Sequence, residues 1–137
     1  MISVGALDMV NFGPIATVPE KFKDRKFYKH NATVTLMRTT VAENHQLGEE
    51  IGRKAAAATG PTAIVLPLLG VSAIDRSGQP FDDSEARETL FQAIRSTHGT
   101  VELIEFANHI NDPHFAEVAA ETLLGLLRLK TVAIMAE

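Results

Sequence analysis

The chain has 137 residues, which fits one domain with a buried core, and its content of 45% hydrophobic and 22% charged residues argues against disorder. A formal net charge of −4 and a pI near 5.7 argue against a general role in binding nucleic acid or anionic membranes. Without cysteine there can be no disulfide, thiolate catalysis or cysteine zinc site, and without a basic leader or an apolar run of about 20 residues we expect a cytoplasmic protein.

The N-terminal part of the chain predicts two strands separated by a long loop. Apolar and β-branched residues predict strands at residues 2–5 and 33–37. Residues 8–32 between them are predicted to be irregular. Within this loop, residues 21–29 carry five basic side chains among aromatic ones. Such a stretch can bind nucleotide or nucleic acid, but in an acidic chain we favour a solvated loop or a subunit contact.

Helices and strands alternate in the rest of the chain. A capping box of Thr40 and Glu43 begins a predicted helix at residues 41–58, and Gly60-Pro61 ends it. Strands at 62–66 and 100–106 enclose a loop at 67–82 and a helix at 84–96. A last helix is predicted at 113–129, and residues 132–135 are predicted to form an edge strand or a docking tail. The side chains expected to face the core are Leu47, Ile51, Ala55 and Ala58 in the first helix, Ala86, Leu90, Phe91 and Ile94 in the second, and Phe115, Ala119, Leu123, Leu126 and Leu127 in the third.

The alternation of strands and helices predicts the fold class. Parallel strands joined by right-handed helical crossovers are the usual solution for such a pattern. We therefore expect residues 1–137 to form a single α/β domain, a Rossmann-like three-layer structure with a mainly parallel sheet of about four strands.

Polar residues follow each predicted strand, and ligands of open parallel sheets bind at that edge. Four loops therefore point to one binding site. Its candidate residues are Asp8 and Asn11 after the first strand, Arg38, Thr39 and Thr40 after the second, Gly70, Ser72, Asp75 and Gln79 after the third, and Asn108, His109, Asn111 and Asp112 after the fourth.

The clearest local signal is Arg38-Thr39-Thr40. It places a guanidinium and two hydroxyls at a helix N-terminus, where free N–H groups and the helix dipole favour phosphate or carboxylate. The alternative is structural: Thr40 caps the helix and Arg38 pairs with Asp8 or Glu43.

Three further residues have both a functional and a structural interpretation. His109 lies in a loop after a strand, where it suits a general base or a metal ligand, although a lone histidine is more often a hydrogen-bonded structural group. Asp75 and Asp82 can hold Mg²⁺ or form turns around Gly78. Asp112 is expected mainly to cap the last helix.

Five motifs in order resemble a known family. They are residues 4–14 (VGALDMVNFGP), 27–31 (FYKHN), 34–40 (VTLMRTT) with Glu43-Asn44, 70–75 (GVSAID) with 78–81 (GQPF), and 109–113 (HINDP). In this order they look like the C-terminal lobe of the uncharacterised protein family that is named after the tomato mosaic virus resistance protein and described as having an ATP-binding domain. The resemblance extends to about Leu127.

The resemblance implies a two-lobed protein with Rossmann-like lobes and a nucleotide ligand, ATP with Mg²⁺. The N-terminal lobe of the family, with its glycine-rich loop, has no counterpart in this chain, so the motifs would form the second wall of a cleft between lobes. On this view Arg38, Thr39 and Thr40 bind phosphate, Asp75 and Asp112 lie near a metal, and Asn11, Gln79 and His109 orient the ligand.

Two other functions remain open from the sequence. The chain can be an enzyme lobe acting on a small carboxylate or phosphate ester, with His109 as general base and Asp8 or Asp75 assisting. It can also be an interaction module that associates with itself or with a missing N-terminal lobe and has no ligand of its own.

Overall fold

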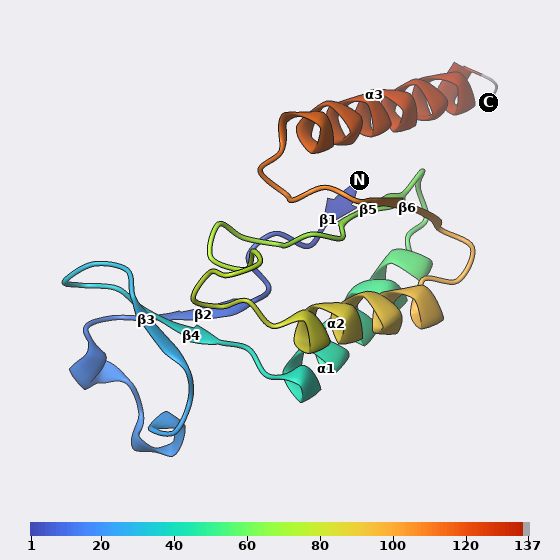
Figure 1. The fold of residues 1–137 in the computed structure, drawn as a ribbon. Helices are drawn as coiled ribbons and strands as arrows, with labels where there is room; N and C mark the ends of the chain where they lie inside the picture. The colour runs from blue at the N-terminus through green and yellow to red at the C-terminus, as the bar shows by residue number, and fades with distance from the viewer. Residues whose placement is uncertain (136–137) are drawn as a thin grey trace.

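The computed structural model describes the backbone of residues 1–135 and the side chains of residues 1–129 (Figure 1). In chain order the elements are β1 (Ile2–Ser3), β2 (Met9–Phe12), the short 3₁₀ helices η1 (Ile15–Thr17) and η2 (Glu20–Phe22), β3 (Phe27–Lys29), β4 (Thr35–Arg38), α1 (Val41–Ala56), β5 (Ala63–Pro67), α2 (Ser84–Thr97), β6 (Glu102–Phe106) and α3 (Pro113–Met135).

The central sheet is parallel and has the strand order β1-β5-β6. β5 lies in the middle, with Ile64 paired to Ile2 on one side and to Leu103 on the other. All of its residues are buried, as expected for a strand covered on both faces. The predicted α/β class is therefore confirmed, with α1 and α2 on one side of the sheet and α3 on the other (Figure 1). The sheet has three strands rather than the predicted four.

The missing fourth strand belongs to a second, antiparallel sheet with the order β2-β4-β3. Residues 33–37 were expected in the parallel sheet, but β4 pairs with β2 and β3 instead. The predicted loop at 8–32 accordingly contains two strands and two 3₁₀ helices. Period-2 alternation identifies a strand but does not say which strands it pairs with. In Figure 1 this sheet projects from the helical body as an arm.

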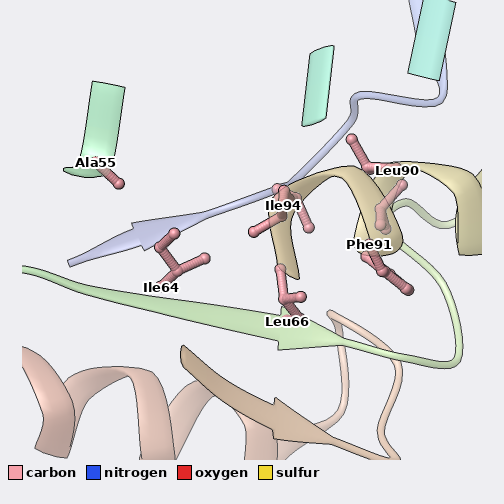
Figure 2. Packing of buried hydrophobic residues seen from close by; sticks show 8 residues of the cluster. Ala55, Ile64, Leu66, Leu90, Phe91 and Ile94 are labelled. Carbon is pink, nitrogen blue, oxygen red and sulfur yellow. The ribbon is translucent and has the colours of Figure 1, made fainter. Parts of the chain in front are cut away.

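The apolar core lies between the parallel sheet and the pair α1 and α2. It contains Val4, Ala55, Ile64, Leu66, Val71, Leu90, Phe91 and Ile94. Figure 2 shows Leu90 and Ile94 of α2 and Ala55 of α1 gathered over Ile64 and Leu66 of β5. The predicted inner face of α2 is confirmed, since Ala86, Leu90, Phe91 and Ile94 are all buried. In α1, Ala55 is buried and Leu47 and Ile51 pack on the core, but Ala58 lies beyond the helix and is exposed.

Glycines allow α1 and α2 to approach closely. A Cβ at Gly48 would lie 2.5 Å from the Leu90 carbonyl oxygen and 2.6 Å from the Ala93 Cβ. One turn later, a Cβ at Gly52 would lie 2.0 Å from Thr97 Oγ1. The two helices therefore touch through backbone at a separation that a larger residue would not permit.

α3 is less buried than predicted. Phe115 is buried and Leu126 is half-buried, but Leu123 and Leu127 are 42% and 51% exposed. Residues 132–135 continue α3 instead of forming an edge strand or a separate tail. None of the described helices combines the length and the apolar character that a membrane crossing needs.

Candidate functional site

Six of the predicted site residues are buried in one polar network at the carboxyl ends of the parallel strands. The network joins the segments after β1 and β4 to the loops after β5 and β6. Its members are Asp8, Arg38, Thr39, Ser72, Asp75 and His109, and none of their side chains is more than 9% exposed.

Arg38 is the centre of this network. Its Nε donates to the Phe81 carbonyl at 2.9 Å, and its Nη1 donates to Thr39 Oγ1 at 3.0 Å and to the Asp8 carbonyl at 3.3 Å. Its Nη2 donates to Asp75 Oδ1 at 3.1 Å and to the Asp83 carbonyl at 3.5 Å. All five N–H donors of the guanidinium are thus directed at protein acceptors, and Arg38 holds four segments of chain together.

Asp75 is fully buried and binds two arginines. Its Oδ1 lies 3.1 Å from Arg38 Nη2 and 2.8 Å from Arg87 Nη1. Its Oδ2 accepts the Val71 N–H at 3.1 Å. Burial raises the pKa of Asp75 above its ordinary value, and the Val71 hydrogen bond and the two guanidinium groups oppose this effect. The carboxylate ties α2 to the loop and to the end of β4.

Asp8 and His109 meet at Ser72. Ser72 Oγ donates to Asp8 Oδ2 at 2.7 Å and accepts the Asp75 N–H at 3.2 Å, while its carbonyl lies 2.8 Å from His109 Nε2. His109 Nδ1 accepts the Asn111 N–H at 3.1 Å. Both ring nitrogens are therefore engaged within the protein. A general base at His109 would first have to give up one of these hydrogen bonds.

The second oxygen of Asp8 is the exception in this network. Among the described residues, Asp8 Oδ1 is a buried side-chain atom without a hydrogen-bond partner. Burial raises the pKa of Asp8, and the Ser72 hydrogen bond and the charge of Arg38 partly offset this rise.

Gly70 lets the two strand-end loops come together. Its backbone φ is +140°, a value that residues other than glycine rarely adopt. A Cβ at this position would lie 2.0 Å from the Asp75 carbonyl oxygen and 2.7 Å from His109 Cδ2. Gly70 therefore allows the loop after β5 to pack directly against His109 in the loop after β6.

The remaining predicted site residues lie around the network rather than in it. Asn11, Thr40, Gln79 and Asn111 are exposed, and Asp112 is half-buried. Asn11 belongs to the arm, where it pairs with Leu36 of β4. Asp112 Oδ2 accepts the His109 N–H at 2.8 Å, which lowers the pKa of Asp112. Asp112 also faces the exposed Arg76 across 3.6 Å.

Thr40 is the N-cap of α1, as the sequence predicted. Its Oγ1 accepts the Glu43 N–H at 3.2 Å, and Glu43 Oε2 accepts the Thr40 N–H at 2.8 Å. Glu43 also binds Arg25, which lowers the pKa of Glu43. Arg38 was predicted to pair with Glu43 or Asp8. The structure pairs Glu43 with Arg25, and Arg38 donates to the backbone carbonyl of Asp8 and not to its carboxylate.

Asp75 and Asp82, the residues predicted to hold Mg²⁺, are both engaged within the protein. Within the described part of the chain, no three residues of the metal-ligating types His, Cys, Asp and Glu come close enough together to hold a metal ion. Asp75 is neutralised by two arginines, and Asp82 Oδ2 accepts the Gly78 N–H at 2.8 Å in a turn. The groove beside Thr39, of about 370 Å³, is lined partly by Glu43 and Glu50, which would repel phosphate.

Sequence reasoning gave no site role to Arg87, Asn44 or Arg76, although Asn44 belongs to one of the family motifs. Arg87 and Asn44 each lie on the buried face of a helix. Leu90 and Phe91 follow Arg87 by three and four residues, and Leu47 and Gly48 follow Asn44 at the same spacing. A polar residue on such a face needs a buried partner, and this was the available signal. Asn44 Nδ2 donates to Thr39 Oγ1 at 2.9 Å. Nothing in the sequence distinguished Arg76 from other loop arginines.

Comparison with known proteins confirms the family resemblance. The model of the uncharacterised protein family (UPF0261) C-terminal domain matches residues 1–127. A UPF0261 protein of Clostridium tetani is 50% identical over 129 residues, which are 93% of this chain and 32% of that protein. The ToMV resistance protein Tm-1(GCR237) of Solanum lycopersicum is 41% identical over 129 residues, which are 92% of this chain and 17% of that protein. The chain thus spans about a third or less of the length of these relatives.

Proposed function

Because the chain belongs to the uncharacterised protein family UPF0261, whose C-terminal domain it contains, we propose that it forms one wall of a binding site for a nucleotide such as ATP or another phosphorylated ligand. One observation carries the proposal: buried ionic hydrogen bonds lock together the loops at the carboxyl ends of the parallel strands. Ligands of open α/β sheets bind at this edge. Buried charges are costly unless they are paired, and here the pairing of Asp75 with Arg38 and Arg87 holds the segments of the rim together.

We assign different roles to the buried and the exposed candidates. Arg38, Thr39, Ser72, Asp75 and His109 position the loops, since their polar groups are already engaged within the protein. Direct contacts to the ligand come from exposed rim groups, with Thr40, Gln79 and Asn111 donating hydrogen bonds and Arg76 supplying positive charge. A phosphate near Arg76 would replace Asp112 as its partner.

The rim supplies only part of what a triphosphate needs. Arg76 is partly balanced by Asp112, and the groove beside Thr39 is acidic. We therefore propose that the ligand lies between this rim and a second wall, which the additional sequence of the longer relatives provides. No carboxylate of the rim is assigned to a metal.

The first test is a titration of the ¹⁵N-labelled chain with ATP, followed by nuclear magnetic resonance. We expect weak binding, with chemical-shift changes concentrated in the loops at residues 70–82 and 107–112 and at Thr40. Changes spread over the outer faces of α1 and α2 instead of these loops would rule out the rim as a nucleotide site.

Matched variants sharpen this test. Asn111→Ala is expected to weaken binding by about three- to tenfold, the usual net value of one ordinary hydrogen bond. Gln92→Ala, an exposed amide on α2, is the control and is expected to leave the affinity unchanged. Equal affinities for the two variants would contradict the assignment of Asn111.

A further inference from the structure

An exposed apolar stripe runs along α3, beside the face that packs on the sheet. It is formed by Ala116, Ala120, Leu123, Leu124 and Leu127, all of which are exposed. Leu124 and Leu127 each expose about half of their surface, at 53% and 51%. Residues 116, 120, 123 and 127 follow the alternating spacing of four and three positions that forms the seam of a coiled coil. The stripe therefore has the pattern of a helix that packs against another helix.

Charged residues flank the stripe in an ordered way. Glu117 and Glu121 lie on the first half of this flank and Arg128 on the second, and all three are exposed. At 100° per residue they fall within about 40° of one another around the helix. The flank is therefore acidic towards the start of α3 and basic further along.

We propose that α3 is the interface of a homodimer, in which the helices of two copies pack antiparallel along this stripe. The antiparallel direction follows from the charges. In an antiparallel pair the charged flank of one helix lies beside the same flank of the other, running in the opposite direction. The acidic half with Glu117 and Glu121 then lies beside the basic half of the partner helix. A parallel pair would place this flank against the opposite side of the seam, where Ala119 and Leu126 are half-buried.

The same arrangement matches side chains by size. With the twofold axis between residues 123 and 124, Leu123 faces the partner's Leu124, and Ala120 faces the partner's Leu127. A small residue opposite a large one lets two helices interlock closely. This inference is independent of the proposed nucleotide site, because α3 and the rim do not share these residues.

Sedimentation velocity of the purified chain tests the dimer. We expect a monomer–dimer equilibrium whose dissociation constant rises at least about tenfold in Leu124→Asp, because the variant places an unpaired charge in the seam. The control is Leu69→Asp, since Leu69 is a leucine of equal exposure, 53%, in the loop after β5; this variant should dimerise normally. A chain that remains monomeric up to millimolar concentration would overturn the proposal, as would equal loss of dimer in the two variants.

Cysteine cross-linking tests the direction of packing, because the chain has no native cysteine. Leu123→Cys should form an intermolecular disulfide on mild oxidation, since residue 123 lies next to the twofold axis. Ala116→Cys should not, since the two copies of residue 116 would be about 22 Å apart along an antiparallel pair, beyond the reach of a disulfide. Cross-linking of Ala116→Cys, or none in Leu123→Cys, would refute the antiparallel interface.

Discussion

The two faces of the parallel sheet are covered in opposite ways. On one face, α1 and α2 pack so closely that only glycine fits at two positions of their contact. Leu90, Phe91 and Ile94 are completely or almost completely buried there. On the other face, α3 buries Phe115 but leaves leucines of the same helix half exposed. α3 is the more apolar of the two layers and yet the less buried one, so hydrophobic content alone does not say which layer is covered.

The difference shows what each layer contributes. The α1–α2 layer anchors the fold and also the site, since Arg87 of α2 and Asn44 of α1 hold Asp75 and Thr39. The α3 layer buries less apolar surface, since three of its leucines are 42–53% exposed. Substitutions in the first layer should therefore change the free energy of unfolding, and those in the second should change it little.

The largest expected difference in the free energy of unfolding is between leucine-to-alanine substitutions in the two layers. Leu90→Ala should lower the free energy of unfolding by about 3 kcal/mol, because it leaves a cavity in a fully buried site. Leu124→Ala should cost less than about 0.5 kcal/mol. Both are measured by urea denaturation at concentrations where the chain sediments as a monomer. Similar losses for the two variants would remove the distinction between the layers.

Adding one methyl group gives a smaller effect whose sign differs between the layers. Gly48→Ala should destabilise the fold by about 2 kcal/mol, since the new Cβ would meet the Leu90 carbonyl at 2.5 Å. Gly125→Ala meets open space on α3 and should stabilise the helix by up to about 1 kcal/mol. Thermal melts of both variants check the signs, and a stabilised Gly48→Ala would show that α1 and α2 pack less closely than described.

The smallest expected effect concerns pH and the network that the first layer supports. Burial raises the pKa of Asp8 in the folded state, so the folded chain holds this proton more tightly than the unfolded chain does. The stability that Asp8 contributes is present below its unfolded pKa and is lost as the pH rises through its folded pKa. The stability of the natural chain relative to Asp8→Asn should therefore fall as the pH rises above the ordinary pKa of an aspartate, 3.8.

Denaturation at a series of pH values measures this difference. Asp24→Asn is the control because it removes a carboxyl group that is exposed. A constant difference for Asp8→Asn would show that Asp8 is ionised as readily in the folded state as in the unfolded chain, and a difference that rises with pH would show that it is ionised more readily.

Local signals in the sequence were sufficient for the helices. The Thr40–Glu43 capping box and the 3.6-residue period of Leu90, Phe91 and Ile94 depend only on neighbours along the chain, and both predictions were correct. The apolar period of α3 was just as clear, but periodicity cannot show whether another surface covers it. That is why Leu123 and Leu127 were wrongly expected to be buried.

The sheets and the site depended on contacts between distant segments. The pairing of β4 with β2 and β3 could not be read from residues 33–37 alone. The expectation that loops after strands meet at one rim brought together Asp8, Arg38, Ser72, Asp75 and His109 correctly. It could not show that these groups would satisfy one another, because Asp75 finds its two arginine partners, Arg38 and Arg87, 37 and 12 positions away in the sequence.

The pairing of β1 with β5 also has a consequence for the order of folding. Ile2 must find Ile64, and Asp8 must find Ser72, 64 positions along the chain. By contrast, Lys29 and Thr35 of the arm are close neighbours in sequence. Closing the longer loop costs more chain entropy, so the arm and the α1–α2 pair are expected to form first. At a synthesis rate of about 5–20 residues per second, β1 would wait for seconds on the ribosome before its partner strand exists.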